Sequence, residues 1–156
     1  MEENRILLEK FYSAFQKKDF KTMQACYALD ATFNDEAFSN LNGKEAGKMW
    51  EMLITRGKDL ELKFEILEAT ENGGKARWIA KYTFSKTKRL VINEIIGVFE
   101  IKNGKILNHA DHFDFYKWAR QAFGLTGLLL GWTTFFKNKV QKTAMESLKK
   151  FIAQDS

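Results

Sequence analysis

The sequence predicts an α+β domain in which three helices precede a four-stranded antiparallel sheet. Apolar residues recur at helical spacing through the first third of the chain, and from Leu60 onward the pattern changes to a period of two. Two turn signals, Asn72-Gly73-Gly74 and Asn103-Gly104, divide the alternating part into strands. With 156 residues, 45% of them apolar, the chain can bury one core.

Three helices are expected in the N-terminal part. The first covers residues 4–17, and the second is short and follows Asp19, a candidate N-cap. An extended segment over residues 31–35 and a polar loop lead to the third helix, over residues 44–56. The apolar residues expected to face the core are Leu7, Phe11, Ala14 and Phe15 in the first helix, Phe20, Met23, Cys26 and Tyr27 in the second, and Met49, Trp50, Leu53 and Ile54 in the third.

Four strands are expected over residues 60–66, 78–84, 90–102 and 105–116. A curved sheet wrapped around helices leaves an apolar interior that suits a small molecule. In the last strand, alternation separates two faces. His109, Asp111, Phe113 and Phe115 share one face, and Ala110, His112, Asp114 and Tyr116 share the other.

The composition changes after Tyr116. Residues 123–136 are strongly apolar and interrupted by glycine, and a final amphipathic helix follows. We therefore predict a domain over residues 1–116 and a helical extension over 117–156 that packs on the domain or on a dimer partner. The predicted apolar stripe of the last helix comprises Phe136, Val140, Ala144, Leu148, Phe151 and Ile152.

The net charge of +5 is confined to the C-terminal quarter. Up to Phe115, 18 basic residues balance 18 acidic ones, whereas 7 basic residues accompany 2 acidic ones from Tyr116 onward. This distribution argues against a nucleic-acid groove, which needs a focused basic face. The single cysteine, Cys26, excludes an intramolecular disulfide, and no stretch of 18 apolar residues predicts a membrane-spanning helix. A cytoplasmic protein is expected.

Several runs resemble the nuclear transport factor 2-like superfamily and, within it, the SnoaL-like branch. They are YALDATFNDEAF after the second helix, NGKEA at the start of the third, and GVFEIKNGKI and HADHFDFY near the end of the sheet. The resemblance covers residues 4–116 and implies a cone-shaped fold that often forms homodimers through the outer face of its sheet. The superfamily holds isomerases, cyclases, hydrolases, dehydratases and non-enzymes, so it implies a fold more than an activity.

By this resemblance, Asp35 occupies the position of the proton-shuttling carboxylate of ketosteroid isomerases. Phe11 and Gly97 stand where those enzymes have an oxyanion-hole tyrosine and a protonated acid. Tyr12 follows Phe11, but one residue rotates a helix by about 100° and places it on a different face. Steroid isomerisation is therefore not expected.

The last strand supplies the other candidates, because the resemblance places its His109 and Asp111 face inside the cone. An Arg-x-Asp pair, typical of the epoxide-hydrolase branch, is missing from the preceding strand, where Asn93 and Glu94 are the nearest polar residues. Asp35 could instead be a loop or cap residue, and Asp111 a buried structural acid. His109-x-Asp111 lacks a third metal ligand and no phosphate-binding glycine motif occurs, so neither a metal nor a cofactor is predicted.

Two main hypotheses remain open. The first is a cofactor-independent acid–base enzyme for an apolar carbonyl, epoxide or polyketide-like compound, and the second is a non-catalytic binding or dimerisation module with a filled cone. The enzyme needs an open cavity that reaches Asp111, whereas the module predicts a cavity that is packed shut. Residues 123–136 could cover the mouth of the pocket, pack on a dimer partner or lie in a membrane interface, and membrane association ranks below the other two. The candidate acid–base residues are Asp111, His109 and Asp35, and the candidate ligand contacts are Phe11, Tyr27, Trp50, Trp78, Tyr82, Phe99 and Phe113.

Overall fold

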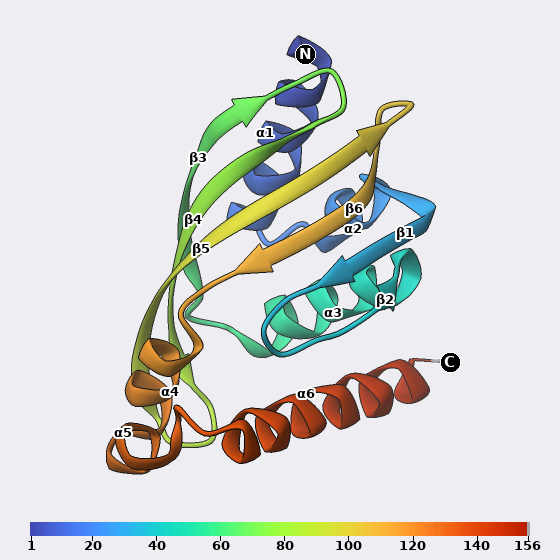
Figure 1. Cartoon of the computed structure of the whole chain (residues 1–156). Helices are drawn as coiled ribbons and strands as arrows, with labels where there is room; N and C mark the ends of the chain where they lie inside the picture. The colour runs from blue at the N-terminus through green and yellow to red at the C-terminus, as the bar shows by residue number, and fades with distance from the viewer. Residues whose placement is uncertain (156) are drawn as a thin grey trace.

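A computed structural model describes residues 1–155 and places a curved sheet around the N-terminal helices (Figure 1). In chain order the elements are α1 (Glu2–Gln16), α2 (Phe20–Ala25), β1 (Tyr27–Asn34), β2 (Leu41–Asn42), α3 (Gly43–Arg56), β3 (Glu61–Ala69), β4 (Gly73–Phe84), β5 (Arg89–Lys102), β6 (Lys105–His112), α4 (Phe115–Phe123), α5 (Leu125–Leu130) and α6 (Thr134–Gln154). The predicted α+β class and cone-shaped fold are confirmed.

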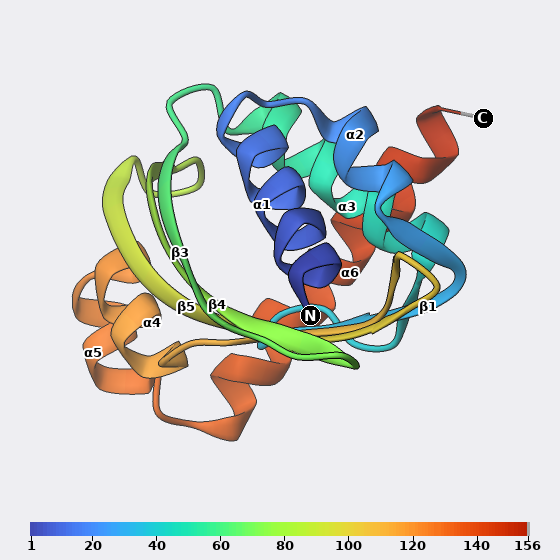
Figure 2. The same ribbon diagram turned by 90° about the horizontal axis from the view of Figure 1, so that it is seen from above.

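The sheet has six strands in the order β2-β1-β6-β5-β4-β3. Its β3 to β6 part is the predicted antiparallel meander. Viewed from above, the sheet curls around α1, with α3 on the same side (Figure 2). Along β5, buried residues alternate with outward-facing ones, so the inner face of the sheet forms one wall of the core.

The structure corrects the expectation that Tyr27 belongs to the second helix. The Ile106 amide donates to the Cys26 carbonyl at 2.8 Å, and β1 then runs parallel to β6 from Tyr27 onward. This pairing joins segments about 80 residues apart in sequence, so local periodicity did not reveal it. The register sets Phe33 beside His109 and therefore brings β1 against the candidate site.

The last strand is shorter than predicted, because it ends at His112 and not at Tyr116. Asp114 caps the next helix by accepting from the Lys117 amide at 3.0 Å. Phe115 therefore starts α4 and does not continue the strand alternation. Asp114 is exposed and has this capping function.

The C-terminal segment packs on the rest of the chain at two places. In α4, Phe115, Trp118, Ala119 and Ala122 form a second buried cluster with Val91 of β5 and Phe136 of α6. Farther along, α6 lies beside α3 and buries Leu148 in the main core. Among residues 1–155, each helix is either too short or too polar to cross a bilayer.

Candidate functional site

The candidate site is built around β6, whose alternation buries His109 and Asp111 completely or almost completely. The pairing with β5 sets Phe99 opposite His109 and Gly97 opposite Asp111. A buried carboxyl group needs hydrogen-bond partners, because an unpaired one is costly to desolvate. Both predicted residues of the last strand therefore face the interior, as expected.

A chain of hydrogen bonds links Asp111 to three other buried side chains. The Trp50 indole N–H donates to Tyr27 Oη at 2.9 Å, and Tyr27 Oη contacts His109 Nδ1 at 2.8 Å. His109 Nε2 lies 2.9 Å from Asp111 Oδ1. The chain is complete when His109 carries its proton on Nε2, since Tyr27 then donates to Nδ1 and the carboxylate accepts from Nε2.

Aromatic rings enclose His109 on several sides. Phe99 stacks on the imidazole with ring centres 4.0 Å apart, and Phe33 meets it edge-on at 4.9 Å. Phe11 and Trp50 lie at 5.7 and 6.1 Å. His109 is therefore fully buried, and its polar contacts are with Tyr27 and Asp111.

The predicted ligand contacts divide into two groups. Five are buried in the packed interior, where they touch one another: Phe11, Tyr27, Trp50, Trp78 and Phe99. The other two, Tyr82 and Phe113, are half-buried and pack against both the main core and the cluster around α4. The second group therefore lies nearer the surface than the first.

Tyr12 is a site residue that the sequence interpretation placed on the wrong face of its helix. Its ring is buried between Phe64, Phe99 and Trp78. Among the described residues, its hydroxyl is the buried side-chain polar atom that lacks a hydrogen-bond partner. Burial raises the pKa of this hydroxyl well above its ordinary value, and the nearby Asp111 raises that pKa further.

Gly97 gives the Tyr12 hydroxyl its place beside Asp111. A Cβ at position 97 would lie 2.7 Å from Tyr12 Oη, 2.9 Å from Asp111 Oδ1 and 3.0 Å from the Phe99 ring. Only the absence of a side chain lets the hydroxyl and the carboxylate converge on this point. Within residues 1–155, Asp111 Oδ2 makes no hydrogen bond, so each of the two groups has unused hydrogen-bonding capacity.

Asp35 lies in the loop after β1, where its Oδ1 accepts from the amides of Ala37 and Phe38 at 2.7 and 2.6 Å. The predicted alternative of a loop-capping aspartate is thus present in the geometry. Burial nevertheless raises the pKa of this carboxyl group to about 7, although the hydrogen bonds from the two amides lower it. The negative charges of Asp111 and Glu36 add to the rise. At this pKa, both the protonated and the ionised form of the Asp35 carboxyl group are populated near neutral pH.

The C-terminal helices complete this side of the site. Trp118 of α4 donates its indole N–H to Tyr82 Oη at 2.8 Å. Burial raises the pKa of Tyr82, and Asp35 contributes to that rise. From α6, Lys137 pairs with Glu36 at 2.5 Å and Gln141 donates to the Glu36 carbonyl at 3.0 Å. The loop that carries Asp35 is thereby fastened to α6.

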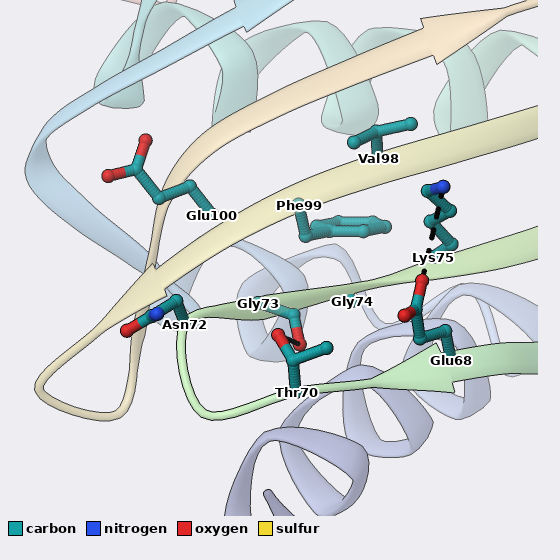
Figure 3. Close-up of a pocket in the computed structure, with 9 residues that line it drawn as sticks. All are labelled: Glu68, Thr70, Asn72, Gly73, Gly74, Lys75, Val98, Phe99 and Glu100. Carbon is teal, nitrogen blue, oxygen red and sulfur yellow. Dashed lines mark hydrogen bonds and ion pairs between the residues drawn. The ribbon is translucent and has the colours of Figure 1, made fainter.

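Two hollows at the surface lie away from the acid groups. One, of about 250 Å³, lies over Gly73 and Gly74 beside the exposed pair Lys75–Glu68 (Figure 3). The other, of about 300 Å³, is bordered by Asn93, His112, Phe113 and neighbouring residues. Asp35, His109 and Asp111 border neither. Within residues 1–155, no cluster of His, Cys, Asp and Glu side chains could hold a metal ion.

Comparison with known proteins identifies the fold independently. A family model described as a SnoaL-like domain matches residues 8–109. No curated protein matches the sequence.

Solved structures of three bacterial proteins are similar over most of their length. An LEH-like epoxide hydrolase of M. tuberculosis shares 23% identity at a TM-score of 0.60, over 82% of this chain and 96% of that one. An NTF2-like protein of unknown function from Burkholderia pseudomallei shares 19% identity at a TM-score of 0.66, over 78% of this chain and 98% of its own. A proposed polyketide cyclase from Xanthomonas campestris shares 14% identity at a TM-score of 0.65, over 78% of this chain and 97% of its own. Such identities establish the fold and leave the activity open.

Proposed function

Since the chain belongs to the SnoaL-like family of the nuclear transport factor 2-like superfamily, we propose that it is a cofactor-independent acid–base enzyme. Its substrate class is a small apolar carbonyl or epoxide compound. The observation that carries this proposal is the convergence of an unpartnered buried hydroxyl, Tyr12, with the carboxylate of Asp111 beside Gly97. Natural proteins rarely leave a buried polar group unpaired, and such groups gather at sites of function.

The three groups have complementary functions in this proposal. Asp35, with a pKa of about 7, is the proton donor or acceptor, because both of its forms are populated near neutral pH. Asp111 is the second carboxyl group, and His109 positions it from behind. Tyr12 donates a hydrogen bond to the substrate oxygen as negative charge develops there.

The reaction differs between the two substrate types in what receives the proton. For an enolisable ketone, the Asp35 carboxylate removes a proton from the carbon beside the carbonyl and returns it to carbon. For an epoxide, the water oxygen bonds to a ring carbon as the C–O bond of the ring breaks, protonated Asp35 gives its proton to the ring oxygen, and Asp111 takes one from the water. Proton exchange with solvent then restores both carboxyl groups. In this proposal the substrate enters beside Tyr82 and Phe113, whose half-buried rings favour an apolar compound.

Two probes test the proposal. One is the exchange of the α-protons of 2-tetralone in heavy water, followed by NMR, and the other is diol formation from styrene oxide. We expect the protein to accelerate at least one reaction, and Asp35→Asn or Asp111→Asn to lower that rate by about 10²–10⁴-fold. Asp30→Asn, which changes an exposed carboxylate of β1, is the matched control and should have no effect.

A rate equal to that of buffer with both probes would contradict the enzyme proposal. The second candidate function would then stand, a non-catalytic binding or dimerisation module. The specific observation in its favour is the ring packing that encloses His109, together with two hollows that do not reach Asp111. In that case Asp111→Asn would change stability alone.

A homodimer is also proposed, through the outer face of the sheet. Ile79 of β4 and Ile92 and Val98 of β5 expose between a third and a half of their surface on the outward positions of these strands. A second copy seated on this face would remove that apolar surface from water.

A further inference from the structure

We propose that one end of the molecule binds the surface of anionic lipid bilayers. The proposal concerns a surface outside the candidate active site and does not depend on the proposed activity. It starts from six exposed apolar side chains on α5, the turn after it and the start of α6, here called the α5 patch: Leu125, Leu128, Leu129, Leu130, Trp132 and Phe135.

The α5 patch is unusually exposed for side chains of this kind. Trp132 and Phe135 are 72% and 77% exposed, and Leu125 is 70% exposed. Leu125, Leu128 and Leu129 follow one another at helical spacing and share one face of α5. Figure 1 shows α5 at an outer corner of the molecule, on the far side of α4 from α1. A soluble protein rarely presents such a patch without an interaction partner.

Glycine fixes this outward orientation. A Cβ at Gly127 would lie 1.9 Å from the Ala119 carbonyl oxygen, and a Cβ at Gly131 would lie 2.8 Å from the Ala119 Cβ. The face of α5 that carries the glycines therefore packs directly against α4. The leucines lie on the opposite, solvent-exposed side. Tyr116 Oη donates to the Leu128 carbonyl at 2.8 Å and anchors α5 further. The patch is a built surface and not a frayed end.

Basic residues border the α5 patch from a distant part of the sequence. The β4–β5 hairpin carries Lys86, Lys88 and Arg89, and Arg89 Nε donates to the Gln121 carbonyl of α4 at 2.8 Å. Arg120 of α4 is also exposed, and its guanidinium group stacks on the Tyr116 ring. Neither residues 72–93 nor residues 115–145 contain a single Asp or Glu. The charged residues of these two segments are therefore all basic, and one of them, Lys137 of α6, is paired with Glu36.

The charge decides between a bilayer and a second copy of the chain. A symmetric dimer through the α5 patch would bring two identical basic borders together, and like charges repel. An anionic bilayer instead offers acyl chains to the leucines and negative headgroups to the lysines and arginines. Tryptophan at the rim of an apolar patch suits the interface between headgroups and acyl chains. The patch therefore fits an anionic membrane surface.

The full chain is tested against vesicles of phosphatidylcholine with phosphatidylserine as the minority lipid, and against pure phosphatidylcholine. Co-sedimentation measures binding. Intrinsic fluorescence reports the contact, because Trp132 is exposed while Trp50, Trp78 and Trp118 are buried. We expect binding and a blue shift of the emission with the anionic vesicles, and Trp132→Phe should abolish the shift.

Three variants make the test specific. The double change Leu128→Gln and Leu129→Gln should lower partitioning by about tenfold or more, because two exposed leucines no longer enter the acyl region. Lys86→Glu should lower it by at least about fivefold, the loss expected for a single lysine at an anionic surface. Leu29→Gln, which changes a fully exposed leucine of β1, is the control and should bind like the unchanged protein.

Three results would overturn the proposal. They are no binding to anionic vesicles by the full chain, equal binding to pure phosphatidylcholine, and binding that survives the double leucine change. Analytical ultracentrifugation tests the alternative that a second copy of the chain binds the α5 patch. A dimer that the double leucine change dissociates would assign the patch to that second copy and overturn the proposal. Circular dichroism of each variant establishes that it is folded.

Discussion

Replacing Tyr12 by Phe removes a single oxygen atom from the centre of the candidate site. The ring keeps its stacking on Phe64, with centres 5.3 Å apart, and its edge contact with Phe99 at 6.0 Å. What disappears is a buried hydroxyl without a hydrogen-bond partner. In the unfolded chain water satisfies that hydroxyl, so folding desolvates it without compensation.

The expected effect is a gain in stability. An unsatisfied buried hydroxyl costs about 1–3 kcal/mol, and the small gap left beside Gly97 returns part of the gain, so we expect about 1 kcal/mol of net stabilisation. For a chain of this length, that corresponds to a rise in Tm of about 2–4 °C. Urea denaturation and scanning calorimetry measure the two quantities independently.

Tyr27 supplies the matched control, because its hydroxyl is equally buried but has two partners, Trp50 and His109. Tyr27→Phe should destabilise the protein by about 1–3 kcal/mol, the opposite sign to Tyr12→Phe. A loss of stability in Tyr12→Phe would refute the reasoning and show that a partner satisfies its hydroxyl. Under the proposed function, the more stable Tyr12→Phe protein should also react about 10²-fold more slowly, since it lacks the donor to the substrate oxygen.

Three further changes test the surroundings of this group. Asp35 has a folded pKa of about 7, above its value in the unfolded chain, so its ionisation destabilises the fold as the pH rises from about 4 to 7. Asp35→Asn should therefore stabilise the protein at pH 7 and above, by at most about 4 kcal/mol, and flatten the profile of stability against pH; an unchanged profile would exclude a raised pKa. Gly97→Ala should destabilise by about 1–3 kcal/mol through overpacking, and less so in the Tyr12→Phe background because the 2.7 Å contact is gone; denaturant titrations that give strictly additive effects would contradict this geometry. Ile79→Glu should convert a homodimer into monomers in sedimentation velocity, whereas a dimer that persists would place the interface elsewhere.

Much of the fold could be predicted because its patterns are local. The amphipathic helices, the period of two in β3 to β6 and two of the three hairpin turns are each visible within about a dozen residues. The parallel pairing of β1 with β6 is different in kind, since neither strand carries a mark of the other. That pairing places Tyr27 in a strand and so delivers its hydroxyl to His109.

The face assigned to Tyr12 was wrong for a geometric reason. The sequence interpretation takes Leu7 as the first core-facing residue of α1. The structure instead buries Leu8 fully and leaves Leu7 half-buried. Leu8, Tyr12 and Phe15 have the i, i+4, i+7 spacing of one helical face, so the signal was present in the sequence. An arc wide enough to hold both Phe11 and Tyr12 is what a helix needs when a curved sheet surrounds it.

The helix α4 is the structural link between the candidate site and the α5 patch. On one side, Trp118 holds the hydroxyl of Tyr82, whose pKa responds to Asp35. On the other, Tyr116 holds the Leu128 carbonyl of α5. Apolar carbonyl and epoxide compounds partition into membranes, so an enzyme seated through α5 would meet them where they are concentrated. The two proposals are nevertheless separable, because a change at Leu128 and Leu129 alters membrane binding while Tyr12 and Asp111 keep their places beside Gly97.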